Sequence, residues 1–202
     1  MGLEEYHIFL GVMSLIALFV FIALYFVKAG YGMFRTASWG VSIDNKLAWV
    51  LMEAPVFFVM IVLWLRSGVG VAIPVFVFLL LFLLHYFQRS FIFPLLMKGK
   101  SRMPVAIMAM GIVFNLLNGM MQAGGLFYFP SSDAYACGWR YFLAPAAISG
   151  ILLFFIGMGI NWHSDYVIRH LRKPGDTKHY LPSRGMYRYV CLLYTSDAAD
   201  EA

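Results

Sequence analysis

Glu53 is the residue whose type and position most require a chemical explanation. It occurs in Met52-Glu53-Ala54-Pro55, about six residues into a long apolar segment. A charged acid at the centre of a membrane-spanning helix costs about 2.5–3.5 kcal/mol on insertion scales, so such residues are usually functional. Burial favours the neutral acid, which can polarise a carbonyl group by hydrogen bonding. The alternative is that Glu53 lies near a helix end or caps a neighbouring backbone.

Tyr86 and Arg89 end another apolar segment, in His85-Tyr86-Phe87-Gln88-Arg89-Ser90. On their own, a tyrosine and an arginine at this place are more typical of interfacial anchors, with an amphipathic ring and a snorkelling side chain. The functional alternative makes the Tyr86 hydroxyl a hydrogen-bond donor beside Glu53. Arg89 then reaches a phosphate at the cytoplasmic rim.

A polar stripe is expected where the last apolar segment continues into basic sequence. At about 100° per residue of an α-helix, Asn161, Asp165, Arg169 and Arg172 fall within about 80° of one another. The simple interpretation is a solvated helix face with an ordinary i, i+4 ion pair. However, Asn161 belongs to the apolar span, where an amide needs a partner. The stripe could therefore line a cleft for an amide or ribose at one end and phosphates at the other.

The basic segment Lys98-Gly99-Lys100-Ser101-Arg102 is a second candidate for anion binding. It is typical of a positively charged cytoplasmic loop, yet Lys98 and Lys100 could also meet an anionic ligand held by the stripe. No Gly-x-Gly-x-x-Gly or Gly-x-x-x-x-Gly-Lys-Ser/Thr motif occurs. A bound nucleotide is therefore held in neither the Rossmann nor the P-loop manner. The two cysteines form no metal-ligand spacing, and we expect no metal site.

The elements that must position these residues are membrane helices. The chain of 202 residues is 62% hydrophobic and 12% charged, whereas soluble domains are about 25% charged. A spanning helix needs about 20 apolar residues. The sequence predicts one all-α domain, a polytopic transmembrane helical bundle whose five spans are His7–Val27, Leu47–Leu65, Val71–Phe93, Met103–Ala123 and Tyr141–Asn161.

Charge distribution predicts the orientation of the bundle. Of the 15 Lys and Arg residues, only Arg66 and Arg140 fall on the side that also holds the N-terminus. Cytoplasmic loops carry the excess of Lys and Arg, so we expect a non-cytoplasmic N-terminus. The same asymmetry explains the net charge of +5 by membrane topology, and we expect no nucleic-acid partner.

A long signature string then points to a family. The run from Gly157 to Tyr166 (Gly-Met-Gly-Ile-Asn-Trp-His-Ser-Asp-Tyr), continuing to Leu171-Arg172-Lys173-Pro174-Gly175, closely resembles the signature of the steroid 5α-reductases. Further landmarks occur in the right order: Glu53-Ala54-Pro55, His85-Tyr86-Phe87 followed by Arg89, and Asn118-Gly119 with Gln122. The resemblance covers about residues 1–190.

The resemblance implies a membrane enzyme of about seven spans that uses NADPH to reduce the C4=C5 bond of a 3-oxo-Δ4-steroid. In that scheme Glu53 and Tyr86 hydrogen-bond the 3-keto oxygen. The expected cofactor-binding residues are Arg89, Lys98, Lys100, Asn161, Asp165, Arg169 and Arg172. A monomer in a lipid bilayer, with a small hydrophobic substrate, is expected. The membrane is the endoplasmic reticulum in a eukaryote and the inner membrane in a bacterium.

The last twelve residues do not continue the family pattern. Residues 191–202 read Cys-Leu-Leu-Tyr-Thr-Ser-Asp-Ala-Ala-Asp-Glu-Ala, with three acids in the last six. We expect a family domain over residues 1–190, an anomalous and non-native tail over 191–202, and no activity for the chain in this form. The alternative functions are a polyprenol or enoyl-thioester reductase of the same superfamily, an isoprenylcysteine-methyltransferase-like enzyme, and a non-catalytic lipid-binding or structural membrane protein.

Overall fold

Five long helices lie side by side in the computed structural model, which describes residues 2–23, 25–26, 39–98, 101–130, 136–171 and 182–189. Each is long and apolar enough to cross a membrane. The long helices are α1 (Leu3–Ala23), α2 (Asn45–Ser67), α3 (Ile73–Phe87), α5 (Val105–Ala123) and α6 (Pro145–Arg169). The shorter elements are β1 (Ser42–Asp44), β2 (Arg102–Pro104), α4 (Phe93–Leu96), the π-helical turns η3 (Gln88–Ile92) and η4 (Gly124–Tyr128), and the 3-10 turns η5 (Gly138–Leu143) and η6 (Gly185–Arg188).

The predicted helical bundle is therefore confirmed, with shifted boundaries. The first helix begins at Leu3 rather than His7, and its first turn holds Glu4 and Glu5, where acidic side chains favour a helix N-terminus. The fifth begins at Pro145, because the preceding residues form η5, and it continues through the polar stripe to Arg169. The predicted tail, 191–202, lies outside the described residues.

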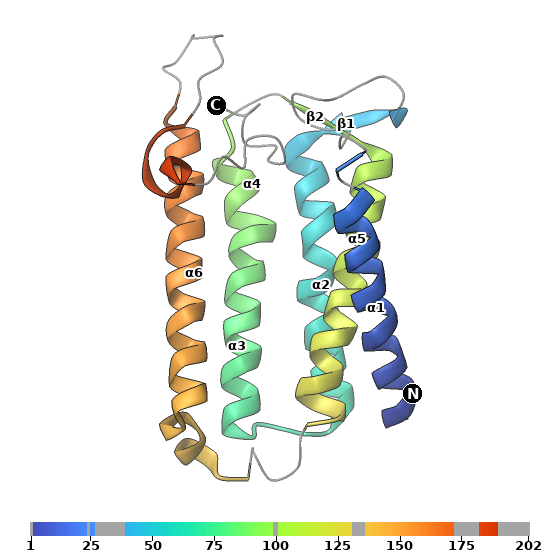
Figure 1. Cartoon of the computed structure of the whole chain (residues 1–202), viewed down its shortest axis with the longest axis vertical. Coiled ribbons are helices and arrows are strands. Elements are labelled where there is room, and N and C mark those ends of the chain that lie inside the picture. Colours follow the sequence, from blue (N-terminus) through green and yellow to red (C-terminus); the bar gives the residue numbers. More distant parts are fainter. Residues whose placement is uncertain are drawn as a thin grey trace.

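A short β-ribbon fixes the start of α2 next to the start of α5. β1 pairs antiparallel with β2, and Ser42 lies opposite Pro104. At the last residue of β1, the Asp44 carboxylate accepts a hydrogen bond from the Leu47 backbone N–H and caps α2. The backbone N–H of Asn45 donates to the Ser101 carbonyl at 3.2 Å. Since both helices leave the same ribbon, they run alongside each other from one end of the bundle (Figure 1).

Small residues on α5 allow it to approach α2 closely. A Cβ atom on Gly119 would lie 3.0 Å from Val56 Cγ2, and one on Gly111 would collide with the Met52 side chain. Between them, at the same i, i+4 spacing, lies the buried Asn115. Small residues at this spacing let helix backbones approach in membranes. The Gly111–Asn115–Gly119 stripe therefore sets the distance between α2 and α5.

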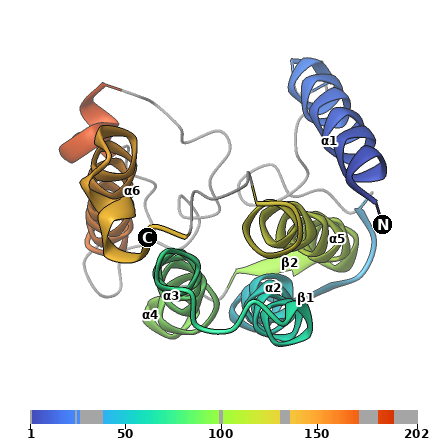
Figure 2. The same cartoon turned by 90° about the horizontal axis from the view of Figure 1, so that it is seen from below.

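The outer helices bury much less of their surface. Seen along the bundle, α2, α3 and α5 lie together, with α1 and α6 at opposite sides (Figure 2). α1 buries only Tyr6 and Met13. The Tyr6 hydroxyl donates to the Met121 carbonyl at 2.8 Å, and its ring stacks on Phe129. Most large apolar side chains of α1 and α6 point outward, as expected for helices that face lipid.

Substitution of Gly119 tests the close approach of α2 and α5. Gly119→Leu forces a larger side chain against Val56, and overpacking of this kind costs about 1–3 kcal/mol. Gly157→Leu is the control, because a Cβ at Gly157 has no neighbour within 4 Å. SDS-induced unfolding in mixed micelles should show lower stability for Gly119→Leu alone. Equal stability of the two variants would contradict this packing.

Candidate active site

Glu53 is held by an asparagine of the neighbouring helix. It lies half-buried on α2, eight residues after the helix begins at Asn45. The Asn115 amide nitrogen donates to Glu53 Oε2 at 3.1 Å and to the Met52 carbonyl at 2.9 Å. Glu53 is thus neither at a helix end nor bonded to a neighbouring backbone. The alternative of a capping carboxyl is not supported by these contacts.

Tyr86 lies near the C-terminal end of α3 and accepts a hydrogen bond from a second asparagine. The Asn118 amide nitrogen donates to the Tyr86 hydroxyl oxygen at 2.7 Å. The Phe82 ring lies 4.6 Å from the Tyr86 ring, centroid to centroid. Glu53 is close enough that its charge acts on the Tyr86 hydroxyl. The structure therefore brings the two sequence-predicted residues, Glu53 and Tyr86, to one place.

Arg89 is the cation of this region and lies in the π-helical turn η3. The turn contains Ser90, four residues before Pro94, and in a regular helix a proline ring clashes with the carbonyl four residues back. The Arg89 guanidinium carbon lies 4.4 Å from the Trp49 ring centre and 4.3 Å from that of Phe93. Such cation–π contacts stabilise a cation where water is scarce. π-Helical turns often occur at functional sites.

The Arg89 charge links the two carboxylates of the site. Its Nη1 lies 3.7 Å from Asp165 Oδ2, an ion-pair distance that is too long for a hydrogen bond. Both side chains are mostly buried, 22% and 10% exposed. The charge of Arg89 also acts on Glu53. Arg89 therefore lies electrostatically between the Glu53–Tyr86 pair and the polar stripe of α6.

The stripe residues Asn161, Asp165 and Arg169 lie on α6, and Asp165 pairs with the Arg89 cation. Asp165 is buried, and Asn161 and Arg169 are partly buried. Asn161 Oδ1 and Arg169 Nη1 are buried atoms without a hydrogen-bond partner among the described residues. Buried polar groups normally have partners. An acceptor and a cationic donor on one helix face fit the amide, ribose and phosphate groups of a nicotinamide dinucleotide.

Of the remaining predicted cofactor residues, Lys98 alone belongs to the part of the chain that the structure describes. Lys98 is exposed beyond α4. Lys100 and Arg172 lie outside the described residues.

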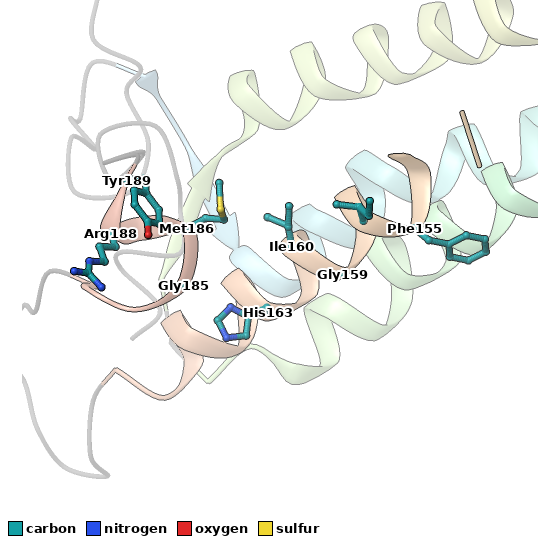
Figure 3. Close-up of a pocket in the computed structure, with 9 residues that line it drawn as sticks. Phe155, Gly159, Ile160, His163, Gly185, Met186, Arg188 and Tyr189 are labelled. Atoms are coloured by element: carbon teal, nitrogen blue, oxygen red, sulfur yellow. The ribbon is translucent and has the colours of Figure 1, made fainter. Parts of the chain in front are cut away.

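η6 supplies a tyrosine to the same region. Burial raises the pKa of Tyr187, the Asp165 carboxylate raises it further, and the Arg89 charge opposes both effects. η6 packs on α6, where a Cβ on Gly185 would lie 2.6 Å from His163 Cε1. Beside this contact is an open groove of about 590 Å³, lined by α6 and by Gly185, Met186, Arg188 and Tyr189 (Figure 3).

A mostly apolar cavity of about 620 Å³ lies one turn of α3 before Tyr86, and its wall contains neither Tyr86 nor Glu53. Phe82, which packs on the Tyr86 ring, is part of its wall. The other walls come from α1, α2, α5 and α6, with Gln122 as a polar group. Ligand sites typically measure about 300–1,000 Å³ and combine apolar walls with a few polar groups. The cavity can therefore hold a lipophilic molecule that has a polar end near Tyr86.

Comparison with known proteins identifies the family. A sequence model described as 3-oxo-5-alpha-steroid 4-dehydrogenase matches residues 101–197. Steroid 5-alpha-reductase DET2 of Gossypium hirsutum is 34% identical over 192 residues, covering 92% of this chain and 72% of the relative. 3-Oxo-5-alpha-steroid 4-dehydrogenase 2 of Homo sapiens is 36% identical over 192 residues, covering 93% and 72%. The chain belongs to the 3-oxo-5-alpha-steroid 4-dehydrogenase family.

Family membership confirms the resemblance predicted from the Gly157–Gly175 string. The protein of the same name from Sus scrofa is 36% identical over 175 residues, covering 84% of this chain and 66% of the relative. The chain thus spans about two thirds of the length of the family members that it matches. The roles of individual residues are not decided by this membership, and they rest on the geometry above.

Sequence reasoning missed several polar contacts of the site in this family member. Asn115 gave no signal except that an amide in an apolar span needs a partner. Asn118 was noticed as a landmark, without a function. Trp49 and Phe93 looked like ordinary apolar residues, and their contact with Arg89 depends on how α2 and α4 pack. Nothing in the local sequence of Tyr187 indicates its neighbours.

Removal of the Arg89 charge tests the electrostatic centre. Arg89→Met leaves the Glu53 and Asp165 carboxyls without their cation, and breaking a buried pair costs about 3–5 kcal/mol. Addition of Asp165→Asn should recover part of the loss, because one uncompensated charge is removed. Arg140→Met, at an exposed arginine, is the control. SDS titration in mixed micelles measures all three; an Arg89→Met variant as stable as Arg140→Met would contradict this role.

Proposed function

We propose that this protein is an NADPH-dependent membrane reductase that acts on the C4=C5 bond of a 3-oxo-Δ4-steroid. The observation that carries the proposal is the meeting of Glu53 and Tyr86 about one helical turn from an apolar cavity. A neutral carboxyl and a phenol are both hydrogen-bond donors. Two donors close to an apolar cavity suit a flat, lipophilic molecule with one ketone. The relatives named above are steroid reductases and dehydrogenases.

Glu53 and Tyr86 stabilise the oxygen on which charge develops. Both hydrogen-bond the 3-keto oxygen and draw electrons from the C4=C5 bond, so that C5 becomes electrophilic. A bound NADPH supplies the hydride that adds to C5. The electron pair of the double bond moves toward the oxygen, and a proton from solvent then adds at C4. Fixed donors aimed at a developing enolate oxygen act strongly in an apolar site.

Asn161, Asp165 and Arg169 hold the cofactor in this proposal, with Arg89 between cofactor and substrate. Arg169 and Arg89 bind anionic phosphate groups, while Asn161 bonds an amide or ribose. Lys98, Lys100 and Arg172 complete the phosphate contacts at the cytoplasmic surface. All these residues come from one chain, which is consistent with a monomer. Because the chain spans about two thirds of its relatives, activity is proposed for the full-length gene product, and residues 1–202 alone are expected to be inactive.

Activity in membranes tests the roles of Glu53 and Tyr86. Glu53→Gln and Tyr86→Phe in the full-length gene product should each lower kcat by about 100- to 1,000-fold, the effect of removing one oxyanion donor. Tyr128→Phe is the control, because its hydroxyl bonds the Leu63 carbonyl, and it should retain activity. NADPH oxidation with a 3-oxo-Δ4-steroid is the measurement. Full activity of both site variants would overturn the mechanism.

A substrate panel separates the related reductases. Polyprenols and enoyl-thioesters carry chains much longer than a steroid, so the proposal expects turnover of steroid and little turnover of either alternative. Family membership gives no support to the methyltransferase-like hypothesis or to a non-catalytic role.

We also propose that the N-terminus is non-cytoplasmic, in the endoplasmic reticulum or a bacterial inner membrane. The N-terminus and η5 lie at the end of the bundle opposite the β-ribbon (Figure 1). Cys137 is exposed next to η5, and Lys98 is exposed near the ribbon. In bacterial cells with a permeabilised outer membrane, an impermeant maleimide should label Cys137 when it is the single cysteine. A Lys98→Cys variant without the native cysteines should react only after lysis, and the reverse pattern would contradict the orientation.

A further inference from the structure

Two asparagines on one face of α5 each bond one member of the proposed catalytic pair. Asn115 and Asn118 are three residues apart, so they project from neighbouring positions on the helix. Asn115 is 5% exposed. One amide meets Glu53 and the other meets Tyr86. Each asparagine would act through the residue that it bonds, so neither is a catalytic residue in the proposed reaction.

The contact of Asn115 with a backbone carbonyl fixes which way its amide faces. The Met52 carbonyl can only accept, so the group that faces it must be the amide nitrogen. The same nitrogen is 3.1 Å from Glu53 Oε2. Oε2 is therefore the accepting oxygen of the carboxyl. The other oxygen, Oε1, is left to share a proton with a ligand.

The contact of Asn118 determines what the Tyr86 hydroxyl can do. A phenol oxygen has one hydrogen to donate and also accepts hydrogen bonds. The amide nitrogen of Asn118, 2.7 Å away, uses the accepting side of that oxygen. The hydrogen of Tyr86 is then available for a different acceptor. A hydrogen bond donated to the phenol also strengthens the bond that the phenol donates.

The short distance between α2 and α5 keeps this arrangement rigid. Gly119 directly follows Asn118, and its missing side chain lets α5 lie against Val56. Because Asn115 and Asn118 sit on the same helix, one backbone holds both amides at fixed positions. A positioned donor retains its effect only if the geometry is maintained within fractions of an ångström.

We propose that Asn115 and Asn118 are positioning residues that set the direction of both catalytic hydrogen bonds. Asn118 makes the Tyr86 hydroxyl a donor to the substrate ketone. Asn115 holds Glu53 Oε2 so that Oε1 carries the proton directed at the same oxygen. The proposal rests on the proposed function, because it assigns a direction to hydrogen bonds of that reaction.

Two replacements of Asn118 distinguish an effect on the direction of the Tyr86 hydrogen bond from an effect on side-chain packing. Asn118→Asp keeps the shape of the side chain but offers only acceptor oxygens when ionised, so it takes the Tyr86 proton away from the substrate. We expect kcat to fall about 100-fold. Asn118→Leu removes the bond without capturing the proton, and a smaller fall of about tenfold is expected. In both variants the steroid KM should change much less than kcat.

A double-mutant cycle distinguishes a positioning role from a structural role. A purely structural loss of kcat would be the same with and without the Tyr86 hydroxyl. In a Tyr86→Phe background the phenol oxygen is absent, so Asn118→Leu should cause no further loss of kcat. The corresponding cycle pairs Asn115→Ala with Glu53→Ala. Each variant of the full-length gene product is checked by its size-exclusion profile in detergent. If Asn118→Leu does not fold, the equally sized Asn118→Asp is used in the cycle.

The kcat values of these variants distinguish the positioning role of Asn118 from the catalytic role of Tyr86. Full activity of Tyr86→Phe overturns the catalytic role of Tyr86, and the positioning role with it. A strong loss in Tyr86→Phe, combined with an Asn118→Leu loss that is equal in both backgrounds, overturns the positioning role alone. A loss confined to the background that contains Tyr86, and larger for Asn118→Asp than for Asn118→Leu, supports it.

Discussion

The Arg89 charge, held inside an apolar bundle, is the interaction on which the site depends. Two carboxyl groups, Glu53 and Asp165, lie within its influence on different helices. Without a cation, two buried acids would be expensive in lipid. The aromatic rings of Trp49 and Phe93, which contact each other edge to face, both pack against the guanidinium. Helices that contact lipid over most of their surface are thus connected through one charge, which also lies between the Glu53–Tyr86 pair and the polar stripe of α6.

The second constraint is the close approach of α2 and α5. The short β-ribbon places the first residues of both helices side by side, and the Gly111–Asn115–Gly119 stripe lets the helices pack closely. Lipid tails are as apolar as leucine, so close backbone packing and hydrogen bonds must supply much of the association energy in a bilayer. The same stripe places Asn115 against Glu53. Packing and chemistry therefore share residues here, and a substitution in this stripe affects both.

Much of the fold could be predicted because span length and charge asymmetry are properties of single segments. Asn161, Asp165 and Arg169 were predictable as a stripe since helical geometry alone places them on one face. The ribbon was missed because strands of three residues have no recognisable periodicity. Lys98, which is exposed beyond α4, stays a predicted contact of an anionic ligand. The partners Asn115, Trp49 and Tyr187 could not be predicted, because each contact depends on which helix packs beside which.

The most direct test of a polarised ketone is the C3=O stretching frequency of a bound, carbon-13-labelled 3-oxo-Δ4-steroid, read by infrared difference spectroscopy of the full-length gene product in membranes. Hydrogen bonds from Glu53 and Tyr86 weaken the carbonyl bond. The band should therefore lie below its position in an apolar solvent and return toward that position in a Glu53→Leu, Tyr86→Phe double variant that still binds steroid. A band at the apolar-solvent position in the unmodified protein, or a lowered band that persists in the double variant, would contradict this role for the two residues.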